Sequence, residues 1–431
     1  MLSRARQRPD AAEPGVWALR DYRLLWLGDA VSAVGSQVTM NALPLIALLS
    51  LHGSGSALGW LRVLYMVPFL LLALPAGLWL ERARQRQVMV AMDLGRAALA
   101  LTVPVAAWLG VLGWTQLCLV AVLGGAMTVV SELALPAYLS RLVGPGRLAA
   151  GNSGLHVNLA TSSTVGPGVT GWLIGLVGAT TALLVDVLSY LVSATALLLI
   201  RGPRDPVPAP PVVELATARR GTREWRGELR DGFRAVWRNP PVRQIALAAT
   251  ISSFGVQFVS VACVVRLVAD LGVSAGWFGA AAAMGGAGGV LGTLGAPPAI
   301  RRLGYGRVLL YGSVLAALPC ALFPLSADPE LAVVLSCAGF FLLGLGGGAT
   351  GTAEVTLRHL LTHSGLHARM NSVFRLAQFT AIPVGSAVAG ILVDRVGARG
   401  TLWICPVVML VALIPVLARE VRALSAVDPA G

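Results

Sequence analysis

The chain of 431 residues contains no lysine, so arginine supplies all 33 of its basic side chains. Either the codon usage of a GC-rich genome or selection for guanidinium chemistry explains this bias. Charged residues make up only 12% of the sequence, against about 25% in soluble domains. The five cysteines all lie within apolar runs and have no C-x-x-C spacing. These shortages argue against a soluble fold, a disulfide framework and a cysteine metal site.

The residue patterns of common enzymes are also missing. The nucleotide-binding pattern G-x-x-x-x-G-K-[ST] is absent, and so are H-E-x-x-H and G-x-S-x-G. His363 and His367 are four residues apart, a possible metal spacing, but they are more typical of a solvated loop pair. We therefore predict a protein that is not an enzyme and that holds no cofactor and no metal.

Apolar residues dominate instead, at 56% of the chain, with a mean hydropathy of +0.75. Runs of mostly apolar residues recur along the sequence, and each is long enough for a bilayer core of roughly 30 Å. We predict an all-α polytopic membrane protein whose main partner is the lipid bilayer. Its predicted spans are residues 24–50, 57–80, 88–112, 114–137, 150–175, 178–200, 243–270, 274–299, 306–325, 330–352, 370–393 and 399–418.

The arginines between these spans indicate the orientation. With the N-terminus inside, 27 arginines lie in cytoplasmic segments, three in outer segments and three within spans, which satisfies the positive-inside rule. Because the arginines are spread over many short segments, they do not indicate nucleic-acid binding. Residues 1–23 lack the apolar region of a cleavable signal peptide. We predict a multi-pass protein of the cell (inner or plasma) membrane with both termini cytoplasmic.

The longest loop, residues 201–242, divides the spans into two sets of six. The predicted order is a cytoplasmic tail (1–23), a six-helix bundle (24–200), this central loop, a second six-helix bundle (243–418) and a C-terminal tail (419–431). Apolar residues at helical spacing in the loop predict an interfacial helix on the inner leaflet or, alternatively, a partner-docking helix. They are Trp225, Leu229, Phe233, Val236 and Trp237.

An internal repeat relates the two bundles. An offset of 219 residues brings Gly171 onto Gly390 and Leu173 onto Leu392. The same offset aligns the pairs Asn152-Ser153 and Asn371-Ser372, and the triplets 177–179 and 396–398. We therefore predict two pseudo-symmetric six-helix halves, an arrangement that occurs in transporters with a substrate site between the halves.

Residues 77–86, Gly-Leu-Trp-Leu-Glu-Arg-Ala-Arg-Gln-Arg, resemble the loop 2-3 signature G-x-x-x-D-R-x-G-R-R of the major facilitator superfamily (MFS). Glu81 replaces the usual Asp, and Arg84 replaces the internal Gly. Four further stretches resemble the drug and siderophore exporter branch, the enterobactin-exporter-like or transmembrane secretion effector group. They are residues 93–96, 148–152, 165–168 and 184–190. The resemblance implies the MFS fold of twelve transmembrane helices.

The resemblance also implies a gating role for a cluster of charges at the cytoplasmic ends of spans two to four. Such a cluster would latch the halves together in the outward-facing state, or would consist of plain positive-inside anchors. Its charged members are Glu81, Arg82, Arg86, Asp93, Arg96 and Glu132, and Gly77 begins the loop 2-3 motif that contains the first three. An antiporter-like motif follows at Gly166, Pro167 and Gly171, for which a simple packing kink is the alternative.

Ionisable groups inside spans are expensive and indicate function. We predict proton coupling at Asp29, Glu132 or Asp186. Asp29 shares a helical face with Ser32, Ser36 and Thr39. Asp186 takes a proton if burial raises its pKa, or is a structural carboxylate held by neighbouring helices.

The substrate cavity is predicted from the spans that line it in MFS proteins. This resemblance selects Gln37, Asn41, Thr128, Gln257 and Thr350. Arg62 replaces an uncharged polar residue of the family and has three possible roles: pairing with a cavity acid, binding an anionic substrate group, or snorkelling outward.

Together these features predict a monomeric proton antiporter that exports a small-molecule substrate by alternating access. The substrate would be a small amphipathic organic compound, such as a drug, a secondary metabolite or a siderophore, and the activity would be multidrug-resistance-type efflux. An uptake symporter or facilitator and a non-transporting membrane sensor are the alternatives.

Overall fold

The computed structural model describes residues 15–202, 233–234, 236–362, 367–422 and 424, and within them the regular structure is helical. The N-terminal half, after a 3-10 turn (Val16–Ala18), contains α1 (Arg20–Leu51), α2 (Gly55–Arg82), α3 (Gln85–Trp108), α4 (Trp114–Val143), α5 (Leu148–Val177) and α6 (Ala179–Leu199). The C-terminal half contains α8 (Pro240–Val264), which continues as a π-helical segment (Val265–Asp270), α9 (Ala275–Leu303), α10 (Tyr305–Ala317), α11 (Pro329–Leu360), α12 (His367–Val411), α13 (Leu413–Val416) and α14 (Arg419–Arg422). The predicted all-α fold of two halves is confirmed.

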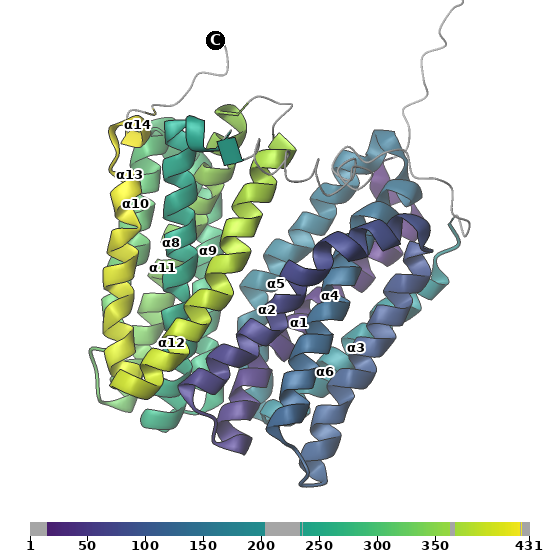
Figure 1. Cartoon of the computed structure of the whole chain (residues 1–431), viewed down its shortest axis with the longest axis horizontal. Helices are drawn as coiled ribbons and strands as arrows, with labels where there is room; N and C mark the ends of the chain where they lie inside the picture. Colours follow the sequence, from purple (N-terminus) through teal and green to yellow (C-terminus); the bar gives the residue numbers. More distant parts are fainter. Residues whose placement is uncertain (1–14, 203–232, 235, 363–366, 423, 425–431) are drawn as a thin grey trace, which may run out of the picture.

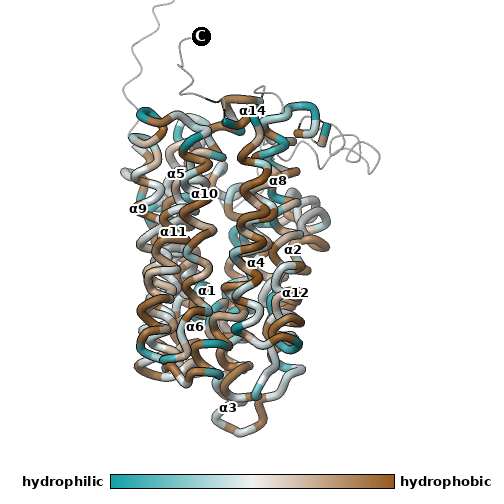
Figure 2. Tube along the Cα trace, turned by 90° about the vertical axis from the view of Figure 1, so that its left-hand side faces the viewer, coloured by the Kyte–Doolittle hydropathy of each residue, from teal (hydrophilic) through white to brown (hydrophobic). Residues whose placement is uncertain are grey.

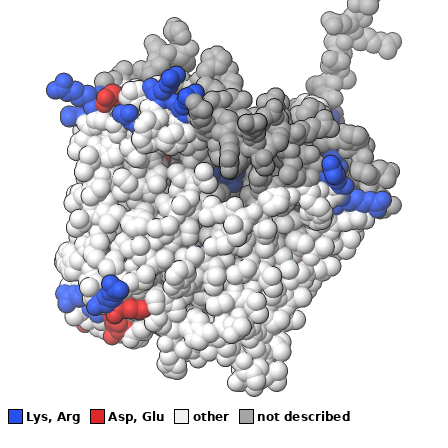
Figure 3. Space-filling model, in the orientation of Figure 1, with Lys and Arg blue, Asp and Glu red and all other residues white. Residues whose placement is uncertain are grey.

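The described residues include ten helices long and apolar enough to cross a membrane. Counting α5 and the second part of α12 as spans would give the predicted twelve; α12 breaks at Gly397, where φ is 78° and ψ is 164°. Hydrophobic segments run along the sides of the bundle (Figure 2), and charged side chains gather at two ends of the visible face in Figure 3. This distribution suits a protein whose sides contact lipid.

We call the end of the bundle where α1 begins and α14 lies the terminal face, and the other end the opposite face (Figure 1). Several helices extend past the apolar runs near the terminal face; α4, for example, ends at Val143 and α11 at Leu360. A helix can continue into the interface because its backbone groups stay paired while its polar side chains reach water. The interfacial helix predicted in the central loop lies mostly outside the described residues, although the described rings of Phe233 and Trp237 stack at 4.9 Å.

The internal repeat is visible in the turns. Gly178 ends α5 with φ 82° and ψ 159°, and Gly397 interrupts α12 with almost the same angles. Glycine adopts this conformation without the steric cost that a Cβ atom would impose. The positions aligned by the offset of 219 residues therefore make the same sharp turn between consecutive spans, as the predicted pseudo-symmetry requires.

Two seams join the halves near the opposite face. In one, α5 packs on α9, and a Cβ atom on Gly171 would collide with the backbone of Gly279. In the other, α2 packs on α12, and a Cβ atom on Gly390 would collide with the backbone of Gly55. The repeat-related glycines Gly171 and Gly390 thus allow a close approach of the halves at each seam.

The apolar core differs between the two ends of the molecule. Near the opposite face, one cluster of buried side chains runs through both halves, from Val38 and Leu117 to Phe258 and Leu402. Near the terminal face, each half has its own cluster, around Leu139 in the N-terminal half and Leu357 in the C-terminal half. The halves also diverge toward the terminal face in Figure 1. The molecule is therefore closed at the opposite face.

Candidate functional site

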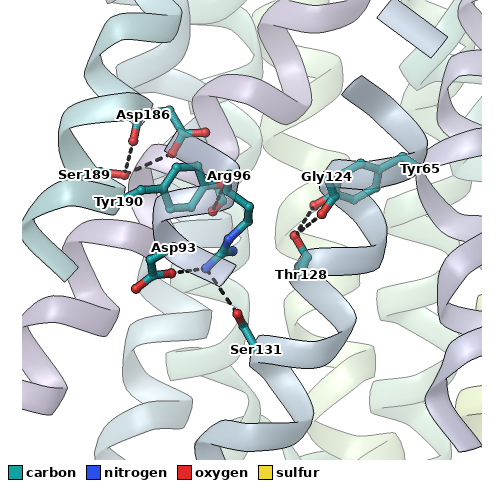
Figure 4. A network of polar contacts seen from close by, with 10 residues as sticks. Tyr65, Asp93, Arg96, Gly124, Thr128, Ser131, Asp186, Ser189 and Tyr190 are labelled. Carbon is teal, nitrogen blue, oxygen red and sulfur yellow. Dashed lines mark hydrogen bonds and ion pairs between the residues drawn. The ribbon is translucent and has the colours of Figure 1, made fainter. Parts of the chain in front are cut away.

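The interior of the N-terminal half holds a polar network centred on Arg96 of α3 (Figure 4). Arg96 pairs with Asp93, one turn earlier on the same helix, and its Nη2 donates to Ser131 Oγ of α4 at 3.5 Å. Its guanidinium carbon lies 4.3 Å from the ring centroid of Tyr190 of α6. Both members of the ion pair are buried, so their charges are compensated where water is excluded.

Asp186 of α6 is fully buried and bonds to hydroxyl groups. Thr39 Oγ1 of α1 donates to one carboxylate oxygen, and Ser189 Oγ donates to the other at 3.0 Å. Tyr190 and Ser36 share a hydrogen bond of 3.0 Å between their hydroxyl groups. Among the described residues, no arginine lies within ion-pair distance of Asp186.

A cavity of about 30 Å³ adjoins this network inside the N-terminal half. Its polar lining is Ser36, Thr39, Tyr65, Arg96, Thr128, Asp186 and Tyr190. This volume holds about two water molecules and is far too small for an organic substrate. The site suits water and protons.

Asp29 of α1 is half-buried and lies closer to the terminal face. Asn158 of α5 donates to its carboxylate at 2.8 Å and also to the carbonyl of Trp26 at 2.9 Å. Asn158 is not among the site residues predicted from the sequence. Its amide in an otherwise apolar stretch is a usable signal, because a buried amide needs a polar partner.

The gating cluster lies in two places. The loop between α2 and α3 consists of Ala83 and Arg84. Within α2, Gly77 is buried and Arg82 is exposed, and the side chain of Glu81 is outside the described residues. Arg86 donates to the carbonyls of Leu197 and Leu198, at 2.7 and 2.6 Å, and so caps α6.

The expected position of Asp93, Arg96 and Glu132 at span ends is wrong. Asp93 lies about 12 Å from the start of α3, and Glu132 lies about 16 Å from the end of α4. The error arose because the helices extend past the apolar runs. Glu132 is exposed, and it lies within electrostatic range of Arg375 on α12 of the other half.

The antiporter-like motif has a packing role on both sides of α5. Gly166 faces Gln37 of α1, where a Cβ atom would lie 2.5 Å from the Gln37 side chain. Gly171, on the other side, meets α9. The side chain of Pro167 is outside the described residues.

Three of the predicted cavity residues bond within their own helices. Asn41 donates to the carbonyl of Gln37 at 2.7 Å, Thr128 to that of Gly124 at 2.8 Å, and Thr350 to that of Gly346 at 3.0 Å. Tyr65 also donates to Thr128 at 3.4 Å.

The structure joins Arg62 and Gln257 across the halves. Arg62 Nη1 of α2 donates to Gln257 Oε1 of α8 at 3.0 Å, so Arg62 turns inward and does not snorkel. The same oxygen accepts a hydrogen bond from Ser386 Oγ of α12 at 3.2 Å. Ser386 was missed because a serine in an apolar run is common and carries no signal of its own.

The sequence profile of the Major Facilitator Superfamily matches residues 25–358 and 245–430. No curated protein sequence matches the chain. Among solved structures, a bacterial homologue of the iron transporter ferroportin in its inward-facing state has a TM-score of 0.71 at 17% identity, covering 92% of this chain and 98% of that chain. A bacterial homologue of ferroportin in the outward-facing state has a TM-score of 0.56 at 19% identity, with the same coverage.

The nucleoside transporter NupG has a TM-score of 0.68 at 13% identity, covering 93% of this chain and all of that chain (100%). At these sequence identities, the likeness to the solved structures shows that this chain has the same fold as they do. Taken with the profile match over nearly the whole length, they place this chain in the Major Facilitator Superfamily, as a multi-pass membrane transporter and not an enzyme.

Proposed function

We propose that this chain is a proton-driven exporter of small amphipathic organic compounds, similar to the enterobactin-exporter-like branch. It would work as a monomer in the cell membrane by alternating access of its two halves, exchanging protons for substrate. The buried carboxylate of Asp186 beside a cavity for about two waters is the observation that carries this proposal.

The distribution of arginine supports a cytoplasmic terminal face. At this face, Arg84 lies in the loop after α2, and Arg82, Arg301 and Arg302 lie in the last turns of α2 and α9. The positive-inside rule expects such arginines on the cytoplasmic side. With this orientation, the closed opposite face is the outer one and the structure corresponds to an inward-facing state. The higher TM-score against the inward-facing ferroportin homologue agrees with this assignment.

The partners of Asp186 support a proton site. A hydroxyl group both donates and accepts hydrogen bonds, so Thr39 and Ser189 suit either protonation state of this carboxyl group. Asp93 differs because a guanidinium only donates, and its pairing with Arg96 favours the charged form. Asp186 is therefore the first choice for proton exchange, with Asp29 and Glu132 nearer the terminal face.

The small volume of the N-terminal cavity supports separate sites for proton and substrate. An organic compound needs a pocket of several hundred Å³, so alternating access of the two halves would bind it between them and not in this cavity. The charged residues near the loop between α2 and α3 would then latch the terminal face when the opposite face opens. In the present state Arg86 contacts its own half.

Accumulation of fluorescent amphipathic compounds in pump-deficient bacterial cells tests the proposal. Cells that express the chain should accumulate less compound than control cells, and a protonophore should abolish the difference. Asp186→Asn should lower efflux at least tenfold at equal membrane expression, and Asp29→Asn should also lower it. Asp270→Asn is the matched control, because Asp270 is an exposed acid at the end of its helix.

The opposite result, higher accumulation in expressing cells, would assign uptake. Purified protein in liposomes with an imposed pH gradient then isolates the acids. Normal substrate-linked proton flux in both Asp186→Asn and Asp29→Asn would remove these residues from the mechanism.

A further inference from the structure

Arg62 lies where the two halves meet. It is about 10 Å from the start of α2 at the opposite face, just beyond the point where Gly59 touches the backbone of Ser386. Its guanidinium bonds to Gln257, which in turn accepts a hydrogen bond from Ser386. One helix of the N-terminal half and two of the C-terminal half therefore converge on this cation, at the inner end of the closed seam.

The hydrogen-bonding capacity of this guanidinium is largely unused. Arginine has five N–H donors, and among the described residues Arg62 has the single acceptor Gln257 Oε1. Its Nε is enclosed and has no hydrogen-bond partner within the same part of the chain. The Gln257 oxygen already accepts two hydrogen bonds, and its amide nitrogen donates to the Ser253 carbonyl at 3.3 Å. Gln257 thus positions the guanidinium without neutralising it.

Several other arginines in the helices have an acidic partner. Arg96 pairs with Asp93, Arg358 is within electrostatic range of Glu354, and Arg375 is within range of Glu132. Arg62 differs, because no acid of the described residues lies within ion-pair distance of it or within electrostatic range. An unpaired cation inside a membrane protein is costly and is kept where function needs it.

We propose that the transported compound carries an oxyanion group, such as a carboxylate, and that Arg62 binds this group. This inference rests on the proposed function and names its substrate class. The planar fork of a guanidinium binds an oxyanion with two parallel hydrogen bonds. The bound anion supplies the counter-charge that the chain does not provide.

An aromatic pair gives the compound an apolar neighbour. Phe69 of α2 and Phe379 of α12 lie 5.6 Å apart between ring centroids. Phe69 is about 10 Å further along α2 from Arg62, toward the terminal face. A compound with its anion on Arg62 and its apolar body against these rings would contact both halves, so its binding would bias the equilibrium between the two conformations.

Thermal unfolding of the detergent-purified full-length chain tests this proposal without a proton gradient. The probes are decanoate, naphthylacetate and pyrenebutyrate, each compared with its methyl ester. At least one acid should raise the unfolding midpoint saturably, with a half-saturating concentration at least tenfold below that of its ester. Arg62→Gln should remove this preference, and Arg62→Lys should keep it with weaker binding, because an ammonium lacks the planar fork.

Gln257→Glu is a control that distinguishes anion binding by Arg62 from a purely structural role. The new carboxylate would pair with Arg62 inside the chain, so the unfolding midpoint without ligand should rise while acid binding falls at least tenfold. The proposal is overturned if no acid binds more tightly than its ester, or if Arg62→Gln retains the preference. If the acids bind as expected but a protonophore leaves transport unchanged, the coupling to protons is wrong and the anion site stands.

Discussion

The two halves share one fold but have different interiors. In the N-terminal half, Asp29, Asp93 and Glu132 lie more than two turns from a helix end, and Asp186 is fully buried. In the C-terminal half, the acids of the described residues lie within about two turns of a helix end or, for Asp394, of the break in α12 at Gly397. Here α9 and α11 pack backbone to backbone, and a Cβ atom on Gly288 or Gly292 would collide with a carbonyl of α11.

This difference indicates a division of labour between repeat-related halves. Charges buried in a membrane protein need partners, and the N-terminal half supplies them through its polar network. Close glycine packing needs no polar groups, and it gives the C-terminal half a stiff framework. We infer that proton exchange belongs to the N-terminal half, while the C-terminal half contributes Gln257 and Ser386 where the halves meet.

The largest effect is expected where the halves touch. Gly171→Leu would push α5 away from Gly279, at a cost of about 3 kcal/mol, which lowers the population of the closed state about 100-fold. Transport should be lost, although each half keeps its own interior. Gly295→Leu is the control, because a Cβ atom there meets nothing within 4 Å. Efflux assays normalised to membrane expression compare the two, and unchanged efflux in Gly171→Leu would show that this seam is not needed.

Removal of the positive charge of Arg96 tests the polar network of the N-terminal half. Arg96→Leu leaves Asp93 buried without its partner, so the chain should lose about 3–5 kcal/mol of stability. Asp93→Asn combined with Arg96→Gln should recover much of this loss. Arg358→Leu is the comparison in the C-terminal half, and its effect should be smaller because Arg358 lies near the end of α11. Thermal unfolding in detergent measures all four proteins, and equal losses in the two single variants would contradict the division of labour.

Glycine packing in the C-terminal half gives a smaller effect. Gly292→Ala places a methyl group against the Leu345 carbonyl, and the strain should destabilise the chain by about 1–3 kcal/mol. Gly124→Ala in the N-terminal half is the matched control, because its Cβ atom would lie 4.0 Å from Leu99 Cδ2, an ordinary contact. Similar unfolding midpoints for the two variants would mean that α9 and α11 can move apart enough to accept the added methyl group without strain.

The fold was predictable from the sequence because a bilayer imposes long apolar helices, and the spacing of arginines and glycines marks their ends. The separate polar residues were also predictable, since Asp186, Asp29 and Arg62 stand out in apolar runs. Their partners were not. Arg62 and Gln257 are 195 residues apart in the sequence, and no pattern in the sequence indicates that their side chains meet in space. Helix ends were placed too early for a related reason, because hydropathy detects the hydrocarbon core and misses helix that continues into the interface.

The smallest effect concerns the cap that the C-terminal half places on the N-terminal half. The carboxylate of Asp394 on α12 accepts hydrogen bonds from the backbone N–H groups of Gly55 and Ser56, at 2.6 and 3.0 Å. Loss of such a cap in Asp394→Ala costs about 1 kcal/mol and should shift the equilibrium toward opening of the opposite face about fivefold. Asp394→Asn should shift it less, because its amide oxygen still accepts one bond. Distances between spin labels on Val111 and Leu325, exposed residues of the two halves, report this opening. An unchanged distribution in Asp394→Ala would mean that the glycine seams alone hold the opposite face closed.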